Sequence, residues 1–152
     1  EDLWPMFGHH FEGAECQTYF CGSIEQDYLN KEAENLGEVR AIVGLGGGQA
    51  LDVAKYFSWC KNLPLFQAPT ALSVNAVYGQ RSGIRIDGKV VYRGWAVPET
   101  VYIDYDVLAN CPAHLNWSGI GDILCFHTGV LDWKYAHSEW GRLKRNGHMM
   151  RV

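Results

Sequence analysis

Three consecutive glycines, Gly46-Gly47-Gly48, follow a run of apolar residues and precede a stretch with helical spacing. Glycines at such a place let the backbone come close to a phosphate, and the N–H groups and dipole of the helix attract its negative charge. The spacing from Gly44 reads G-x-G-G-G, which differs from the common dinucleotide fingerprint G-x-G-x-x-G. The turn therefore predicts a site for a nucleotide diphosphate, with a tight strand-to-helix turn that binds nothing as the alternative.

Polar residues accompany this turn. Asp52 and Lys55 lie in the first turns of the predicted helix, where an acid suits the helix dipole and a lysine could reach a ligand. As isolated charges, both also fit a solvated helix surface. Thr70, Ser73 and Asn75 follow the next predicted strand, and ligands of parallel α/β sheets bind beyond the carboxyl ends of the strands. By composition alone, this segment is simply a loop.

A carboxylate lies near the start of a predicted apolar helix. Asp122 ends the motif Gly119-Ile120-Gly121-Asp122 and precedes four apolar residues. Burial of an unpaired charge there would be costly, so Asp122 needs a partner, and a metal ion is one candidate. The simpler interpretation is that Asp122 caps the helix. His127 lies about 140° around the helix from Asp122, so the two do not form a same-face ligand pair.

The elements that must position these residues alternate between strand and helix. We predict strands at residues 17–21, 39–45, 63–67 and 100–103, helices at 24–36, 49–59 and 116–140, and a hairpin with strands 84–86 and 90–92. Ser23 is the expected N-cap of the first helix, and Gly119 and Gly121 are expected to interrupt the last one. The order of the elements predicts an α/β fold with a parallel sheet.

Composition restricts the class of protein. The 152 residues include 47% hydrophobic and 20% charged residues, which is typical of one globular domain with a buried core. The net charge of −4 provides no basic surplus for nucleic acid or an anionic membrane. No run approaches the roughly 20 apolar residues of a membrane span. Five scattered cysteines without a C-x-x-C pair favour reduced thiols. We therefore expect a cytoplasmic protein without nucleic-acid or membrane partners.

Several motifs in this order resemble those of one superfamily, the iron-containing alcohol dehydrogenases and glycerol dehydrogenases. The motifs are residues 46–55, 69–73, 98–104 and 119–122. Residues 131–136 are most similar to the glycerol-1-phosphate dehydrogenase branch. The resemblance implies a Rossmann-like parallel sheet flanked by helices, with a β-hairpin insertion.

The resemblance also implies roles for the matched residues. Those expected to contact the cofactor, NAD or NADP, are Gly46, Gly47, Gly48, Asp52, Lys55, Thr70, Ser73 and Ser82. Asp122 matches a ligand of a divalent metal, which would polarise a ketone or hold an alkoxide while hydride moves to or from the nicotinamide. Zinc is expected rather than iron, because Phe126 stands where the iron-dependent branch has a histidine. Asn75 stands where related enzymes have an acidic substrate contact, so the resemblance does not identify the substrate.

Three units are expected on this basis: an irregular segment at 1–16, part of a nucleotide-binding α/β domain at 17–116, and at 117–152 the first helix of a truncated metal-binding domain with a tail. Because further histidine ligands of the family lie in a C-terminal helical domain, we expect a fragment that binds metal weakly and is inactive alone. The expected function is the NAD(P)-binding part of a metal-dependent dehydrogenase of a polyol or polyol phosphate, self-associating through its exposed truncated face. The alternatives are a non-catalytic nucleotide-binding or protein-interaction module and a dehydroquinate-synthase-like lyase.

Overall fold

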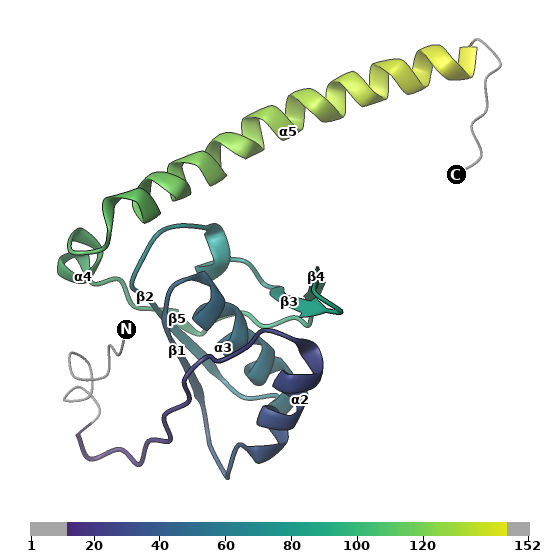
Figure 1. Ribbon diagram of the computed structural model, residues 1–152. Helices are drawn as coiled ribbons and strands as arrows, with labels where there is room; N and C mark the ends of the chain where they lie inside the picture. Colours follow the sequence, from purple (N-terminus) through teal and green to yellow (C-terminus); the bar gives the residue numbers. More distant parts are fainter. Residues whose placement is uncertain (1–11, 146–152) are drawn as a thin grey trace.

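The computed structural model describes residues 12–145, which form an α/β body and one long helix. The elements are α2 (Gln26–Asn35), β1 (Ile42–Gly46), α3 (Gly48–Lys61), β2 (Leu65–Pro69), the 3-10 helix η2 (Asn75–Val77), β3 (Ser82–Ile86), β4 (Lys89–Arg93), β5 (Thr100–Val101), α4 (Tyr105–Ala109) and α5 (Ala113–Arg145). Figure 1 shows α5 extending from the body as a single rod. The predicted α/β class is confirmed, while most of the predicted segment 1–16 and the end of the unit 117–152 lie outside the described residues.

A parallel sheet in the order β1-β2-β5 forms the centre of the body. Ile42 lies opposite Leu65, and Phe66 lies opposite Thr100. Because all three strands run in the same direction, their carboxyl ends meet at one edge, which is where an α/β sheet binds ligands. The turn after β1 and the loop after β2 are therefore neighbours.

The predicted hairpin is confirmed as an antiparallel pair of β3 and β4. Asp87 and Gly88 form its turn with φ values of 51° and 75°. Positive φ at both central residues matches the right-handed twist of the flanking strands, and Asp-Gly is a favoured sequence for such turns. The hairpin packs on α3 through Ile84, which is fully buried.

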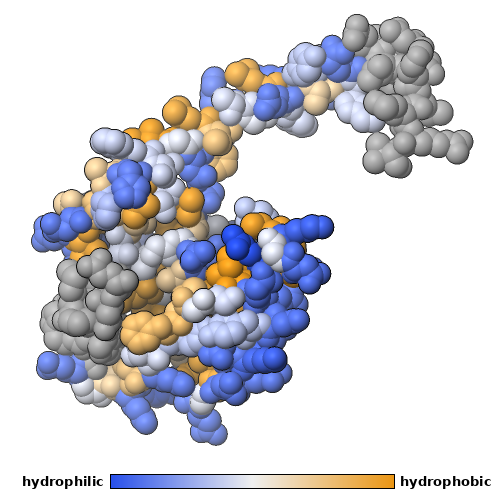
Figure 2. All heavy atoms as spheres, viewed as in Figure 1, coloured by the Kyte–Doolittle hydropathy of each residue, from blue (hydrophilic) through white to orange (hydrophobic). Residues whose placement is uncertain are grey.

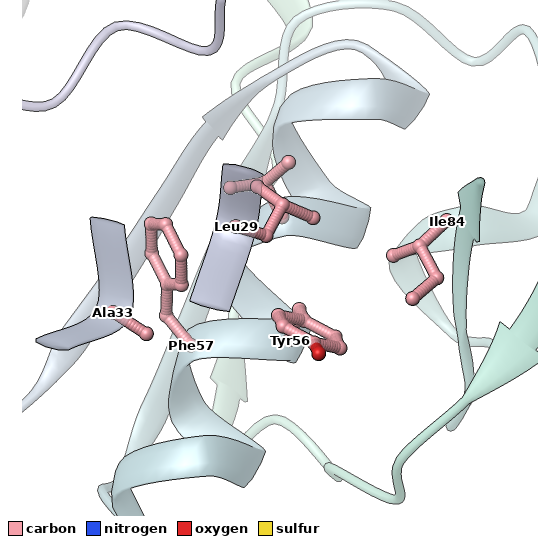
Figure 3. Close-up of a cluster of buried hydrophobic side chains, with 6 residues drawn as sticks. Leu29, Ala33, Tyr56, Phe57 and Ile84 are labelled. Carbon is pink, nitrogen blue, oxygen red and sulfur yellow. The ribbon is translucent and has the colours of Figure 1, made fainter. Parts of the chain in front are cut away.

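Helix α3 is held between the sheet, α2 and the hairpin. Figure 3 shows the side chains that gather on one side of it; the whole cluster consists of Leu29, Ala33, Val53, Tyr56, Phe57 and Ile84. Val53, Tyr56 and Phe57 share a face because residues three and four apart on a helix are neighbours. On the sheet side, Leu51 and Ala54 are buried as well. This packing fixes the direction of α3, and with it the position of the glycine turn at its first residue.

The N-terminal part of the body differs from the prediction. The strand predicted at residues 17–21 is wrong, because this segment has no strand pairing and contacts the body through side chains. The ring of Tyr19 packs edge-on against Phe57 with centroids 5.2 Å apart. The N-cap prediction is also wrong: Glu25 is the N-cap of α2, and Ser23 Oγ instead accepts a hydrogen bond of 3.2 Å from the Glu25 N–H.

Helix α5 is continuous from Ala113 to Arg145. The predicted interruption at Gly119 and Gly121 is wrong, because a helical glycine costs only about 1 kcal/mol relative to alanine and can be tolerated within a long helix. The strand predicted at 100–103 is shorter than expected and ends at Val101. Within residues 12–145, no helix combines the length and the apolar character needed to cross a bilayer.

Candidate functional site

The glycine turn joins β1 to α3 and has one open position. Gly46 has a φ of 142°, and a Cβ there would lie 2.9 Å from the Cβ of Ala50. A Cβ at Gly48 would lie 2.8 Å from Cγ2 of Val74, whereas a Cβ at Gly47 would meet no atom of the described residues within 4 Å. Gly47 is the N-cap of α3, and no side chain of residues 12–145 caps the helix with a hydrogen bond. The turn therefore presents the unpaired N–H groups of a helix start beside open space, as a phosphate site requires.

The loop of residues 70–77 lies against this turn. The Thr70 N–H donates a hydrogen bond of 3.0 Å to the carbonyl of Gly46. Further along, Ala76 and Val77 are buried with Leu51 of α3. Ser73 is half-buried in the same loop, and Asn75 is exposed. The structure thus brings two predicted cofactor residues and the predicted substrate residue to the edge of the sheet that carries the glycine turn.

Asp122 lies beside Asn75. Its Oδ2 accepts a hydrogen bond of 3.1 Å from the Asn75 N–H, and the side chain is half-buried. The interpretation of Asp122 as a helix cap is wrong, because α5 begins at Ala113 and Asp122 lies well inside it. The predicted metal and substrate residues are therefore neighbours.

The other predicted cofactor residues form a separate cluster between α3 and β3. Lys55 is 1% exposed, and its Nζ lies 2.7 Å from Oδ1 of Asp52, 3.0 Å from the Gly79 carbonyl and 2.8 Å from the Arg81 carbonyl. These partners match the three N–H donors of an ammonium group. The interpretation of Lys55 as a surface charge is therefore wrong. Ser82, also 1% exposed, follows Arg81 in the segment that Lys55 holds.

Asp52 is partly buried in this cluster. Burial raises the pKa of its carboxyl above the ordinary value of 3.8, and the Lys55 ammonium and the Gly83 N–H oppose that rise by stabilising the carboxylate. The ion pair lies within α3, whereas the hydrogen bonds of Lys55 to the Gly79 and Arg81 carbonyls and that of the Gly83 N–H to Asp52 tie residues 79–83 to this helix. The cluster also adjoins the loop of residues 70–77, because the Gly79 N–H donates a hydrogen bond of 3.0 Å to the Asn75 carbonyl.

No group of three or more His, Cys, Asp or Glu side chains within residues 12–145 is arranged to hold a metal ion. A catalytic zinc site takes three protein ligands and an open position. Asp122 alone, with one oxygen bonded to the Asn75 N–H, does not provide such a set. The described residues therefore do not fit a complete metal site.

Sequence reasoning missed two polar residues that support this region. Gln67 is fully buried in β2, and its Nε2 donates a hydrogen bond of 3.0 Å to the Leu51 carbonyl of α3. Asn116 of α5 accepts from the Leu72 N–H at 3.4 Å and donates to the Leu108 carbonyl at 3.2 Å. A polar residue in an otherwise buried strand was a signal for Gln67. No pattern in the sequence marks Asn116.

Comparison with known proteins identifies the family to which this chain belongs. The model of the iron-containing alcohol dehydrogenase family matches residues 10–112. The chain belongs to this family. A glycerol-1-phosphate dehydrogenase (NAD(P)+) of Aeropyrum pernix is 36% identical over 99 residues, which are 65% of this chain and 28% of that protein. Its counterpart in Thermoplasma volcanium is 32% identical over 125 residues, or 81% of this chain and 36% of that protein. This family member thus spans well under half the length of these relatives.

Solved structures of the family share the fold. A glycerol dehydrogenase of Schizosaccharomyces pombe matches with a TM-score of 0.62 and 32% identity, covering 70% of this chain and 28% of its own. A probable glycerol dehydrogenase of Sinorhizobium meliloti 1021 matches with a TM-score of 0.70 at 22% identity, covering 79% of this chain and 35% of its own. The resemblance to the iron-containing alcohol dehydrogenase and glycerol dehydrogenase group is confirmed.

Proposed function

We propose that this chain is the nucleotide-binding part of a metal-dependent, NAD(P)-linked dehydrogenase that acts on a polyol or a polyol phosphate. The observation that carries the proposal is the open position at Gly47, next to the uncapped start of α3. The names of the relatives, glycerol-1-phosphate dehydrogenase (NAD(P)+) and glycerol dehydrogenase, support the cofactor and the substrate class.

In this proposal the pyrophosphate lies against the turn of Gly46, Gly47 and Gly48, where the helix dipole and first-turn N–H groups attract its charge. Thr70 and Ser73 offer hydroxyl groups from the adjoining loop. The cluster of Asp52, Lys55 and Ser82 supports the site indirectly. The ammonium of Lys55 already has three partners, and two of them, the Gly79 and Arg81 carbonyls, lie in the segment that follows the loop of residues 70–77. The nicotinamide, once bound, supplies the hydride chemistry.

Asn75 and Asp122 define the substrate side of the proposed site. The Asn75 N–H holds one carboxylate oxygen of Asp122, so this carboxylate is oriented before any ligand arrives. Asp122 would give the other oxygen to a divalent metal, zinc rather than iron. Because the described residues do not complete a metal site, we expect the 152-residue chain to bind zinc weakly and to lack turnover alone.

Replacement of Gly47 by valine tests the proposal. The φ of −81° and ψ of −175° at Gly47 suit an L-residue, and its Cβ would meet no described atom, so Gly47→Val should fold normally. We expect the variant to bind NADH at least ~10-fold more weakly, because the side chain fills the place of the phosphate. Gly129→Val is the matched control, since a Cβ at Gly129 also meets no described atom within 4 Å.

NADH fluorescence gives the affinity, and thermal unfolding followed by circular dichroism checks the fold. If Gly47→Val binds NADH as tightly as the unaltered chain, the diphosphate does not lie at this turn. An unaltered chain that binds neither NAD(H) nor NADP(H), while forming an oligomer, would favour the non-catalytic interaction module instead.

A further inference from the structure

Three residues of α5 form a stripe along the side that meets the loop of residues 70–77. They are Asn116, Gly119 and Asp122, and their spacing of three places them on neighbouring turns of one helix face. Asn116 Oδ1 accepts from the Leu72 N–H, and Asp122 Oδ2 accepts from the Asn75 N–H. Between them, the backbone of Gly119 lies directly against the carbonyl of Leu72.

We infer that this stripe is a positioning device, which fixes the loop of residues 70–77 against the glycine turn and so holds the nucleotide site in shape. The inference rests on the proposed function. The same loop reaches the turn on its other side, because a Cβ at Gly48 would lie 2.8 Å from Cγ2 of Val74 and 3.8 Å from the Cβ of Ala76. A shift of the loop at Leu72 would therefore change the contacts of Val74 and Ala76 with the first residue of α3.

Gly119 makes the tightest contact of the stripe. A Cβ on Gly119 would overlap the carbonyl oxygen of Leu72 and would lie 3.0 Å from its carbonyl carbon. Both atoms belong to the backbone, so a flexible side chain cannot relieve the overlap by rotating. A residue larger than glycine at this position must displace the loop or the helix.

Asn116 ties the stripe to a third element. Its Nδ2 donates to the carbonyl of Leu108 in α4, and this bond turns Oδ1 toward the Leu72 N–H. An amide serves here because it combines a donor and an acceptor on one rigid plane. Asn116 is therefore a positioning residue that connects α4, α5 and the loop, and nothing in its contacts requires it to touch a ligand.

Replacement of Gly119 by alanine tests the inference most directly. We expect Gly119→Ala to speed amide hydrogen exchange at Asn75 by at least ~10-fold, because the loop moves away from Asp122. The affinity for NADH should fall by about 10-fold as the loop shifts from the turn. Gly121→Ala is the matched control: a Cβ at Gly121 meets no described atom within 4 Å, so exchange and affinity should stay unchanged.

Variants of Asn116 separate positioning from stability. Asn116→Leu removes both hydrogen bonds, and because these are long, we expect about 3-fold weaker NADH binding with an unchanged unfolding midpoint. Asn116→Asp keeps the acceptor for Leu72 and should restore part of the affinity. Gly119→Ala without faster exchange at Asn75, or with unchanged NADH affinity, would overturn the inference. If the unaltered chain does not bind NADH, the proposed function fails, and the exchange data alone decide whether the stripe fixes the loop.

Discussion

Helices α3 and α5 are both rich in apolar residues, but their surroundings are opposite. Helix α3 has 14 residues, and those from Val53 to Ser58 are all buried between the sheet, α2 and the hairpin. Helix α5 has 33 residues and exposes large apolar side chains on several sides, namely Trp117, Ile120, Ile123, Leu124, Phe126, Val130, Leu131, Trp133, Tyr135 and Trp140. Figure 2 shows apolar residues along the rod that α5 forms. The apolar composition of a helix therefore does not by itself determine whether its side chains are buried or exposed.

The contacts of the two helices differ in kind as well. Helix α3 is held by the packing of apolar side chains. The stabilisation from such packing is roughly proportional to the apolar area removed from water. Helix α5 meets the loop of residues 70–77 through Gly119 and the polar side chains of Asn116 and Asp122. Exposed apolar surface of this extent is typical of an interaction surface. The same substitution is therefore expected to change the free energy of unfolding by different amounts in the two helices.

The largest expected difference is between two phenylalanines. Phe57 of α3 is 3% exposed and Phe126 of α5 is 61% exposed. Phe57→Ala should lower the free energy of unfolding by about 3–5 kcal/mol, because it removes buried area and leaves a cavity. Phe126→Ala should change it by less than about 0.5 kcal/mol in dilute solution. Urea denaturation of both variants measures the difference, and similar losses would show that α5 is packed in solution.

A second test asks whether the exposed face of α5 joins two copies of the chain. We expect the chain to self-associate, and Val130→Glu to weaken the association by about 10-fold because a charge enters an apolar contact. Val90→Glu is the matched control, since Val90 is also exposed but lies on the hairpin. Sedimentation equilibrium measures both. A chain that stays monomeric at all concentrations, or equal effects of the two variants, would contradict this prediction.

The smallest expected effect is the pH dependence contributed by Asp52. Because burial raises the pKa of Asp52 in the folded chain above its ordinary value of 3.8, ionisation favours the unfolded state. The free energy of unfolding is therefore highest, as far as Asp52 is concerned, below about pH 3.8, where its carboxyl is protonated in both states. This stabilisation is lost as the pH rises through the raised pKa of the folded chain. Asp52→Asn should lack this loss. The free energy of unfolding of both chains, measured by urea denaturation across this range, gives the difference.

Asp132→Asn is the control for this experiment, because Asp132 is exposed on α5. It should keep the loss of stability with rising pH that the unaltered chain shows. If Asp52→Asn has the same pH dependence as the unaltered chain, the stabilisation of the carboxylate by Lys55 and Gly83 balances the burial of Asp52.

The sequence by itself determined those helices, strands and turns that have a clear local pattern of residues. The Asp-Gly turn predicted the hairpin because few residue pairs adopt positive φ at both positions. The apolar run before Gly46 predicted a parallel strand, and the helical spacing after Gly48 predicted α3. These features depend on backbone preferences and periodicity, which neighbouring residues alone decide. The family followed from the same motifs in order.

Only the tertiary structure decided how the candidate site is divided. Asp52 and Lys55 are near Gly48 in sequence, yet the burial of Lys55 beside the 79–83 segment turns them toward the hairpin. Asp122 is far from Asn75 in sequence and still lies within hydrogen-bond distance of it. Such pairings depend on which elements pack together, and a contact between distant segments leaves no periodic pattern in either of them. For the same reason, the apolar residues of α3 and α5 look alike in the sequence and differ only in what covers them.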